Sequence, residues 1–179
     1  MPIVRPLTAG ERAIVGRVFG PSVDCDRVRI HNRRWLVLAQ PRDSGMAPRG
    51  HVYMHGLAWR DDYAAAGTMH RAWFVHEMTH VWQYQNRVCV PLWAGASQML
   101  RTGFRYGRCY DYRADAARDL LDYNLEQQAR IVEHWYLATV LRSPPVGYDA
   151  AGVKAVLARF LVNPAYPRRR ILPSHVDNN

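Results

Sequence analysis

One predicted helix, which spans about residues 69 to 87, constrains the fold of this chain more than any other segment. Apolar residues recur in it at helical spacing, at Trp73, Val75, Met78, Val81 and Trp82. The two histidines of this segment, His76 and His80, fall beside that apolar stripe. We therefore expect a helix whose polar chemistry lies on one flank.

The pentapeptide His76-Glu77-Met78-Thr79-His80 has the HExxH pattern. Residues four apart on a helix lie one turn apart on the same side, so both imidazoles can reach one ion. Zinc lowers the pKa of a water that it binds, and a neighbouring carboxylate can accept the proton as the water attacks a carbonyl. The pattern predicts a zinc-dependent hydrolase with metal ligands His76 and His80 and general base Glu77. In the alternative reading, they are two surface histidines without a metal.

A catalytic zinc site requires a third protein ligand, and Glu126 is the predicted one. It lies 46 residues after His80, in a long helix predicted from about residue 114 to 141. A glutamate between helical apolar positions can point at the first helix. The competing candidates are the other acidic residues and histidines nearby: Asp115, Asp119, Asp122, Glu133, His134, His70 and His55.

Further residues can support such a site. Asp122, Arg130 and Glu133 share a side of the predicted long helix with Glu126, so some of them can orient the ligands from a second shell. A tyrosine can stabilise the oxyanion of the tetrahedral intermediate. The sequence leaves three candidates unranked: Tyr110, Tyr112 and Tyr123.

The rest of the sequence predicts a small N-terminal sheet and two shorter helices. Thr8 and Glu11 form a capping box for a helix that Gly20 and Pro21 end. Strands are expected at residues 27–31, 34–39 and 51–55, mostly loop at 41–50 and 88–112, and a last helix at 150–161. An extended peptide substrate could lie along residues 51–55. The fold class is α+β, mainly helical, in a single domain over residues 1–179.

The composition of the chain bears on which classes of function are expected. The 179 residues contain 49% hydrophobic and 22% charged residues, without an apolar run long enough for a membrane span or an ordinary signal peptide. The three cysteines, Cys25, Cys89 and Cys109, form no CxxC pair, which favours buried thiols over a Cys89–Cys109 disulfide. The net charge of +9 favours acidic partners, but no specific nucleic-acid recognition pattern accompanies it.

Several segments together resemble the Vgr-related metallopeptidases of type VI secretion systems and, more distantly, the peptidase-like domain of contractile injection systems. The resemblance covers about residues 6 to 167. Its segments are Val18-Phe19-Gly20, Val28-Arg29-Ile30-His31, Met46-Ala47-Pro48-Arg49-Gly50-His51-Val52-Tyr53, His76-Glu77-Met78-Thr79-His80-Val81-Trp82-Gln83, Tyr110-Asp111-Tyr112 and Tyr123-Asn124-Leu125-Glu126-Gln127-Gln128-Ala129.

The resemblance implies a zincin-like fold, Zn2+ held by His76, His80 and Glu126, and Glu77 as the general base. It further implies an effector that is made in the cytoplasm and exported by a secretion machine to the periplasm of a target cell. The expected partners are a protein or peptidoglycan peptide substrate, a VgrG-like spike or other carrier, and an immunity protein. The alternative is a non-catalytic, zinc-containing scaffolding module of a contractile particle.

Overall fold

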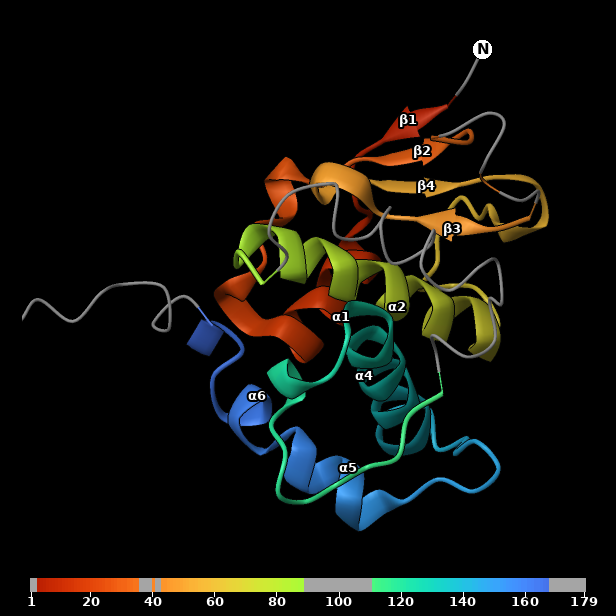
Figure 1. Cartoon of the computed structure of the whole chain (residues 1–179). Coiled ribbons are helices and arrows are strands. Elements are labelled where there is room, and N and C mark those ends of the chain that lie inside the picture. The colour runs from red at the N-terminus through yellow and green to blue at the C-terminus, as the bar shows by residue number, and fades with distance from the viewer. Residues whose placement is uncertain (1–2, 36–39, 41–42, 89–110, 168–179) are drawn as a thin grey trace, which may run out of the picture.

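A small sheet, one central helix and a second group of helices make up the fold. The structure is a computed structural model that describes residues 3–35, 40, 43–88 and 111–167. In Figure 1, α2 runs between the sheet on one side and α4, α5 and α6 on the other. The chain is therefore mainly helical α+β, as predicted. The helices are α1 (Ala9–Phe19), α2 (Thr68–Gln85), α4 (Leu125–Thr139), α5 (Ala150–Val156) and α6 (Ala158–Val162).

Within the described residues, the sheet has four short strands in the order β1-β2-β4-β3: β1 (Val4–Arg5), β2 (Ile30–Asn32), β3 (Gly45–Met46) and β4 (Val52–Met54). β2 and β4 are parallel, with Ile30 opposite Val52, and the other two pairs are antiparallel. Because β4 is hydrogen-bonded on both sides, the prediction that a peptide lies along residues 51–55 is wrong. Among the described strands, β3 is the one at the edge nearest α2.

Strand boundaries differ from the predictions for local reasons. Residues 25–27 form a 3-10 turn because the Asp24 side chain accepts a hydrogen bond from the Asp26 amide, so the strand predicted at 27–31 begins only at Ile30. The strand predicted at 34–39 is absent from its described part, Arg34 and Trp35, and the remainder lies outside the described residues. β3 falls within the predicted loop at 41–50.

The first helix follows its predicted capping signals. The Thr8 hydroxyl accepts a hydrogen bond from the Glu11 amide (3.1 Å), and the Glu11 carboxylate accepts one from the Thr8 amide (2.9 Å). The helix ends at Phe19, where Gly20 adopts a φ of 52° that side chains other than glycine rarely tolerate.

The third and fourth predicted helices are each shorter in the structure than the sequence analysis predicted. α4 begins at Leu125 rather than near residue 114, because the Asn124 side chain caps it together with Gln127. Before it, Asp119 caps a separate 3-10 turn, Leu120–Asp122. The helix predicted at 150–161 is split at Leu157 into α5 and α6.

The core is built around α2. Its residues Phe74, Val75, Met78 and Trp82 are fully buried, and the Trp82 indole donates a hydrogen bond to the carbonyl of Pro164 (2.8 Å). Cys25 is a partly buried free thiol, whereas Cys89, Cys109 and most of the loop predicted at 88–112 lie outside the described residues. None of the helices that the structure describes is both long and apolar enough to span a membrane.

Candidate metal centre

The two histidines of the HExxH pattern lie one turn apart on α2, with ring centroids 5.0 Å apart. The sequence predicted one apolar stripe beside a polar flank, but α2 is buried over most of its surface. His76, Glu77, Thr79 and Gln83 are buried together with the apolar residues. Buried polar groups require partners, so the contacts of these side chains define the site.

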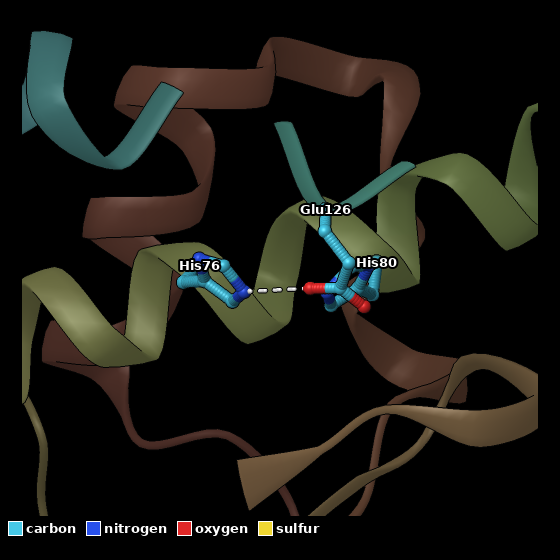
Figure 2. Close-up of side chains that lie close together, drawn as sticks. All are labelled: His76, His80 and Glu126. Atoms are coloured by element: carbon cyan, nitrogen blue, oxygen red, sulfur yellow. Dashed lines mark ion pairs between the residues drawn. The ribbon is translucent and has the colours of Figure 1, made fainter. Parts of the chain in front are cut away.

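Glu126 meets both histidines from the first turn of α4. One carboxylate oxygen, Oε2, lies 3.5 Å from Nε2 of His76 and 3.3 Å from Nε2 of His80. Figure 2 shows the carboxylate and both imidazoles turned toward a common point. The three ligand atoms lie within 4.8 Å of one another, close enough to hold a metal ion. Two histidines on one helix and a glutamate on a second form a zincin-like arrangement.

His76 is oriented by a charged pair on α4. Its Nδ1–H donates a hydrogen bond to Oε2 of Glu133 (3.1 Å), and Arg130 donates to the same oxygen (3.1 Å). Nε2 is thereby left to face Glu126. Burial by itself disfavours a charged imidazole, but the hydrogen bonds to Glu126 and Glu133 raise the pKa of His76 to about 10. Glu133 and Arg130 thus occupy the supporting positions predicted for them.

His80 is oriented by an amide network that the sequence analysis missed. Its Nδ1–H donates a hydrogen bond to Oε1 of Gln83 (2.8 Å). The Gln83 amide nitrogen donates to the carbonyl of Leu125 (2.9 Å) and to Oε1 of Gln128 (3.0 Å). Gln83 lies three residues after His80 on the same side of the helix, and this spacing could have predicted their contact. Burial also disfavours a charged His80, yet the carboxylate of Glu126 raises the pKa of this imidazole.

The same contacts shift the pKa of Glu126 in the opposite direction. Burial by itself would raise its pKa, but the two imidazoles lower it well below the ordinary value for a glutamate. The carboxylate is therefore ionised throughout the physiological range. Two nitrogens and one anionic oxygen are the donor set that zinc accepts in catalytic sites, so the residues present fit this ion.

Glu77 is buried beside the ligands and against the edge strand. A Cβ atom at Gly45 of β3 would lie only 2.4 Å from Oε1 of Glu77, so this close approach requires a glycine. The other oxygen, Oε2, has no hydrogen-bond partner within the described part of the chain. Burial raises the pKa of Glu77 even though both histidines oppose that shift. A carboxylate with a raised pKa is a better proton acceptor for catalysis near neutral pH.

A cleft of about 1290 Å3 opens beside this centre and is lined by His76 and Glu77 together with residues from α4 and its flanking segments. Tyr112 and His134 also line it, and the Tyr112 hydroxyl lies 2.9 Å from Nδ1 of His134. The cleft thus gives solvent-exposed access to the proposed reacting groups.

Two comparisons with known proteins agree on the relatives of this chain. It is 38% identical over 162 residues to the type VI secretion system spike protein VgrG2b of Pseudomonas aeruginosa. It also superposes on the solved effector domain of that protein with a TM-score of 0.69 and 36% identity, covering 87% of this chain and 81% of the domain. The chain belongs to the VgrG2b effector-domain family. The family predicted from the sequence is confirmed.

The relationship to the VgrG2b spike concerns one part of it. The alignment covers 80% of this chain but only 15% of the spike. No protein-family model matches the sequence. The comparisons therefore connect this chain to the effector domain of VgrG2b.

The other candidate ligands of this VgrG2b-type domain have different roles in the structure. Asp115, Asp119 and Asp122 accept hydrogen bonds from backbone amides in the turns before α4. The Nε2 atom of His70 lies 3.2 Å from the carbonyl of Leu57. Within the described residues, the metal-binding group comprises only His76, His80 and Glu126, so neither His55 nor His134 joins it.

The three tyrosine candidates differ in their positions and contacts. The hydroxyl of Tyr123 donates to the carbonyl of Arg113 (3.0 Å) and accepts from the amide of Asp115 (3.0 Å), so it holds the segment before α4. Tyr112 lies in the cleft, and burial raises the pKa of its hydroxyl, which keeps it protonated. Tyr110 lies outside the described residues.

Proposed function

We propose that this chain is a zinc metallopeptidase or amidase that acts as a type VI secretion effector in the envelope of a target cell. The observation that carries this proposal is the convergence of His76, His80 and Glu126 beside the buried carboxylate of Glu77. Membership of the VgrG2b effector-domain family supports the delivery route. A purely structural metal site would have no use for the Glu77 carboxylate at this position.

Each residue has a distinct task in this proposal. His76, His80 and Glu126 would hold the zinc, which would polarise the scissile carbonyl and acidify a water molecule. Glu77 accepts the proton of the attacking water and passes it to the leaving amine, and its raised pKa suits both transfers. Of the three tyrosine candidates from the sequence, Tyr112 is the one that lines the described cleft, where its hydroxyl contacts His134, and it is the proposed hydrogen-bond donor to the developing oxyanion.

The proposed substrate is an extended peptide that pairs with the edge strand β3 and so runs past the metal centre. β3 lies against Glu77 at Gly45, and an extended peptide that adds to this edge would pass the proposed general base. The proposed partners are a protein or peptidoglycan peptide, a VgrG-like spike or carrier, and an immunity protein. These follow from the family and not from a surface of the structure.

The decisive test of catalysis is Glu77→Gln, with the exposed carboxylate Asp115→Asn as the matched control. We expect the Glu77 variant to retain zinc, measured by elemental analysis, and to lose toxicity when directed to the periplasm. The control should retain both. Full toxicity of a zinc-loaded Glu77→Gln protein would contradict the catalytic proposal and favour a scaffolding module.

The third ligand is tested separately with Glu126→Ala. We expect zinc affinity to fall by at least about 100-fold, because one of three protein ligands is lost and two buried imidazoles lose their common carboxylate. Asp115→Ala, which removes a competing candidate, should bind zinc like the unmodified protein. Equal zinc affinity of the two variants in a competition titration would exclude Glu126 as a ligand.

A further inference from the structure

Several large apolar side chains line the cleft beside the metal centre. Met69 and Trp73 from the start of α2 face the same cleft as Val146 and Val153 from the segment around α5. Met69 is 65% exposed and Val146 is fully exposed to solvent. Large apolar side chains that remain exposed next to reactive groups are typical of surfaces that a ligand covers.

The balance of charged residues in the cleft lining differs from that of the whole chain. The chain has a net charge of +9, yet the described cleft lining contains two arginines against four carboxylates. One of the arginines, Arg130, is already paired with Glu133 at 3.1 Å. The described lining is therefore much less positive than the chain as a whole, and a bound zinc would offset its excess of carboxylates, so charge alone does not select the substrate of this cleft.

We propose that this cleft selects a polypeptide with a large apolar side chain next to the cleaved bond, and not a peptidoglycan stem peptide. The inference rests on the proposed function, because it names the substrate class of the same site. A stem peptide offers mainly alanine methyl groups for apolar contact, so it would leave Met69 and Val146 largely uncovered. A leucine or phenylalanine side chain offers them a larger apolar surface.

The first experiment compares substrates of the zinc-loaded protein. A peptide library from a digested bacterial proteome and purified disaccharide stem peptides are incubated with it, and the products are identified by mass spectrometry. We expect cleavage of library peptides with Leu, Ile, Val, Phe or Met enriched beside the cleaved bond. Preferential cleavage of the stem peptides, or library cleavage without such enrichment, would overturn the inference and leave the proposed hydrolase intact.

The second experiment measures binding without catalysis. Glu77→Gln protein is titrated with two fluorescent peptide pools of random sequence that differ only in a fixed central leucine or alanine. We expect the leucine pool to bind at least about tenfold more tightly, which is within the range for a filled apolar pocket. Equal binding of the pools would overturn the inference. Leucine-selective binding by a protein that hydrolyses no peptide would support the inference and contradict the proposed function.

Two substitutions test which residues cause the preference for leucine over alanine. Val146→Asp changes a fully exposed side chain at the cleft, and Val162→Asp changes one that is 87% exposed on α6, away from the cleft lining. Neither change should disturb folding, because exposed side chains contribute little to stability. We expect Val146→Asp to reduce the leucine-to-alanine preference toward unity and Val162→Asp to retain it. An unchanged preference in Val146→Asp, checked with Met69→Asp, would overturn the role assigned to these apolar side chains.

Discussion

The two histidines share one glutamate but have different partners on their outer nitrogens. On the cleft side, His76 donates to Glu133, which is paired with Arg130. On the other side, His80 donates to Gln83, whose amide also bonds α4 at Leu125 and Gln128. The charged partner governs the charge and basicity of its imidazole, whereas the amide partner also joins two helices. We therefore expect the cleft side to control chemistry and the other side to control packing.

The sharpest test of the cleft side is Gly45→Ala. Its new Cβ would lie 2.4 Å from Oε1 of Glu77, so the carboxylate must move. A displacement of about 1 Å in a catalytic group can cost about 100-fold in rate, and we expect a loss of that size in hydrolysis. Zinc content should not change, because Gly45 contacts no proposed ligand. Gly67→Ala, which has open space around its Cβ position, is the control and should retain activity.

Glu133→Gln tests whether the charged partner governs metal binding. Loss of a carboxylate that supports a ligating histidine typically lowers metal affinity by about 10- to 100-fold, and we expect zinc affinity to fall within this range. Competition with a fluorescent chelator measures it. Normal zinc affinity of Glu133→Gln together with reduced zinc affinity of Gln83→Leu would contradict the chemical role assigned to the charged partner of His76.

Gln83→Leu tests the packing role of the amide partner. The substitution leaves His80, Leu125 and Gln128 each without a buried hydrogen bond. We expect the free energy of unfolding to fall by about 1–3 kcal/mol, measured by urea denaturation of the metal-free protein. The control is Gln85→Leu at the end of α2, because its two hydrogen bonds to the Asp24 backbone are exposed. Equal stability of the Gln83 and Gln85 variants would contradict the packing role.

The last expected effect, a pH dependence of stability, concerns the metal-free protein alone. The pKa of His76 is raised to about 10 in the folded state, above its ordinary value of about 6.5. Its protonation therefore stabilises the fold fully below about pH 6.5, and this contribution is lost as the pH rises toward 10. We expect the Tm in chelator to fall over this interval by about 2–4 °C for each 1 kcal/mol lost.

The same pH series with Glu133→Gln provides the control. This variant removes the negative charge of Glu133, which helps to raise the pKa of His76, so its Tm should fall less over the same interval. A Tm that is constant from neutral pH to about pH 10 in the unmodified protein would contradict the assigned role of the charged partner.

The sequence predicted the parts of the centre that depend on helical spacing. The separation of His76 from His80 requires only the geometry of one helix, and Glu126, Arg130 and Glu133 share a side of another at intervals of three to four residues. The position of Glu126 between helical apolar residues favoured it over the other acidic residues, and the family resemblance implied the same ligand. These contacts could be anticipated because each depends on a regular element.

The parts that were missed depend on irregular backbone or on contacts between distant segments. β3 contains only Gly45 and Met46, too few residues for an alternating pattern, so its approach to Glu77 could not be predicted. The start of α4 was misplaced because Asn124 was not recognised as a cap. Gln83 was overlooked because its partners lie more than 40 positions away along the chain.

The position of Glu126 on a different helix from the histidines has a mechanical consequence. An ion held by His76, His80 and Glu126 would act as a removable cross-link that closes a long stretch of chain between α2 and α4. Chelation should then loosen the junction of these helices as well as stop hydrolysis. Metal-depleted protein should accordingly be cut faster by an added protease, and restored zinc should protect it again.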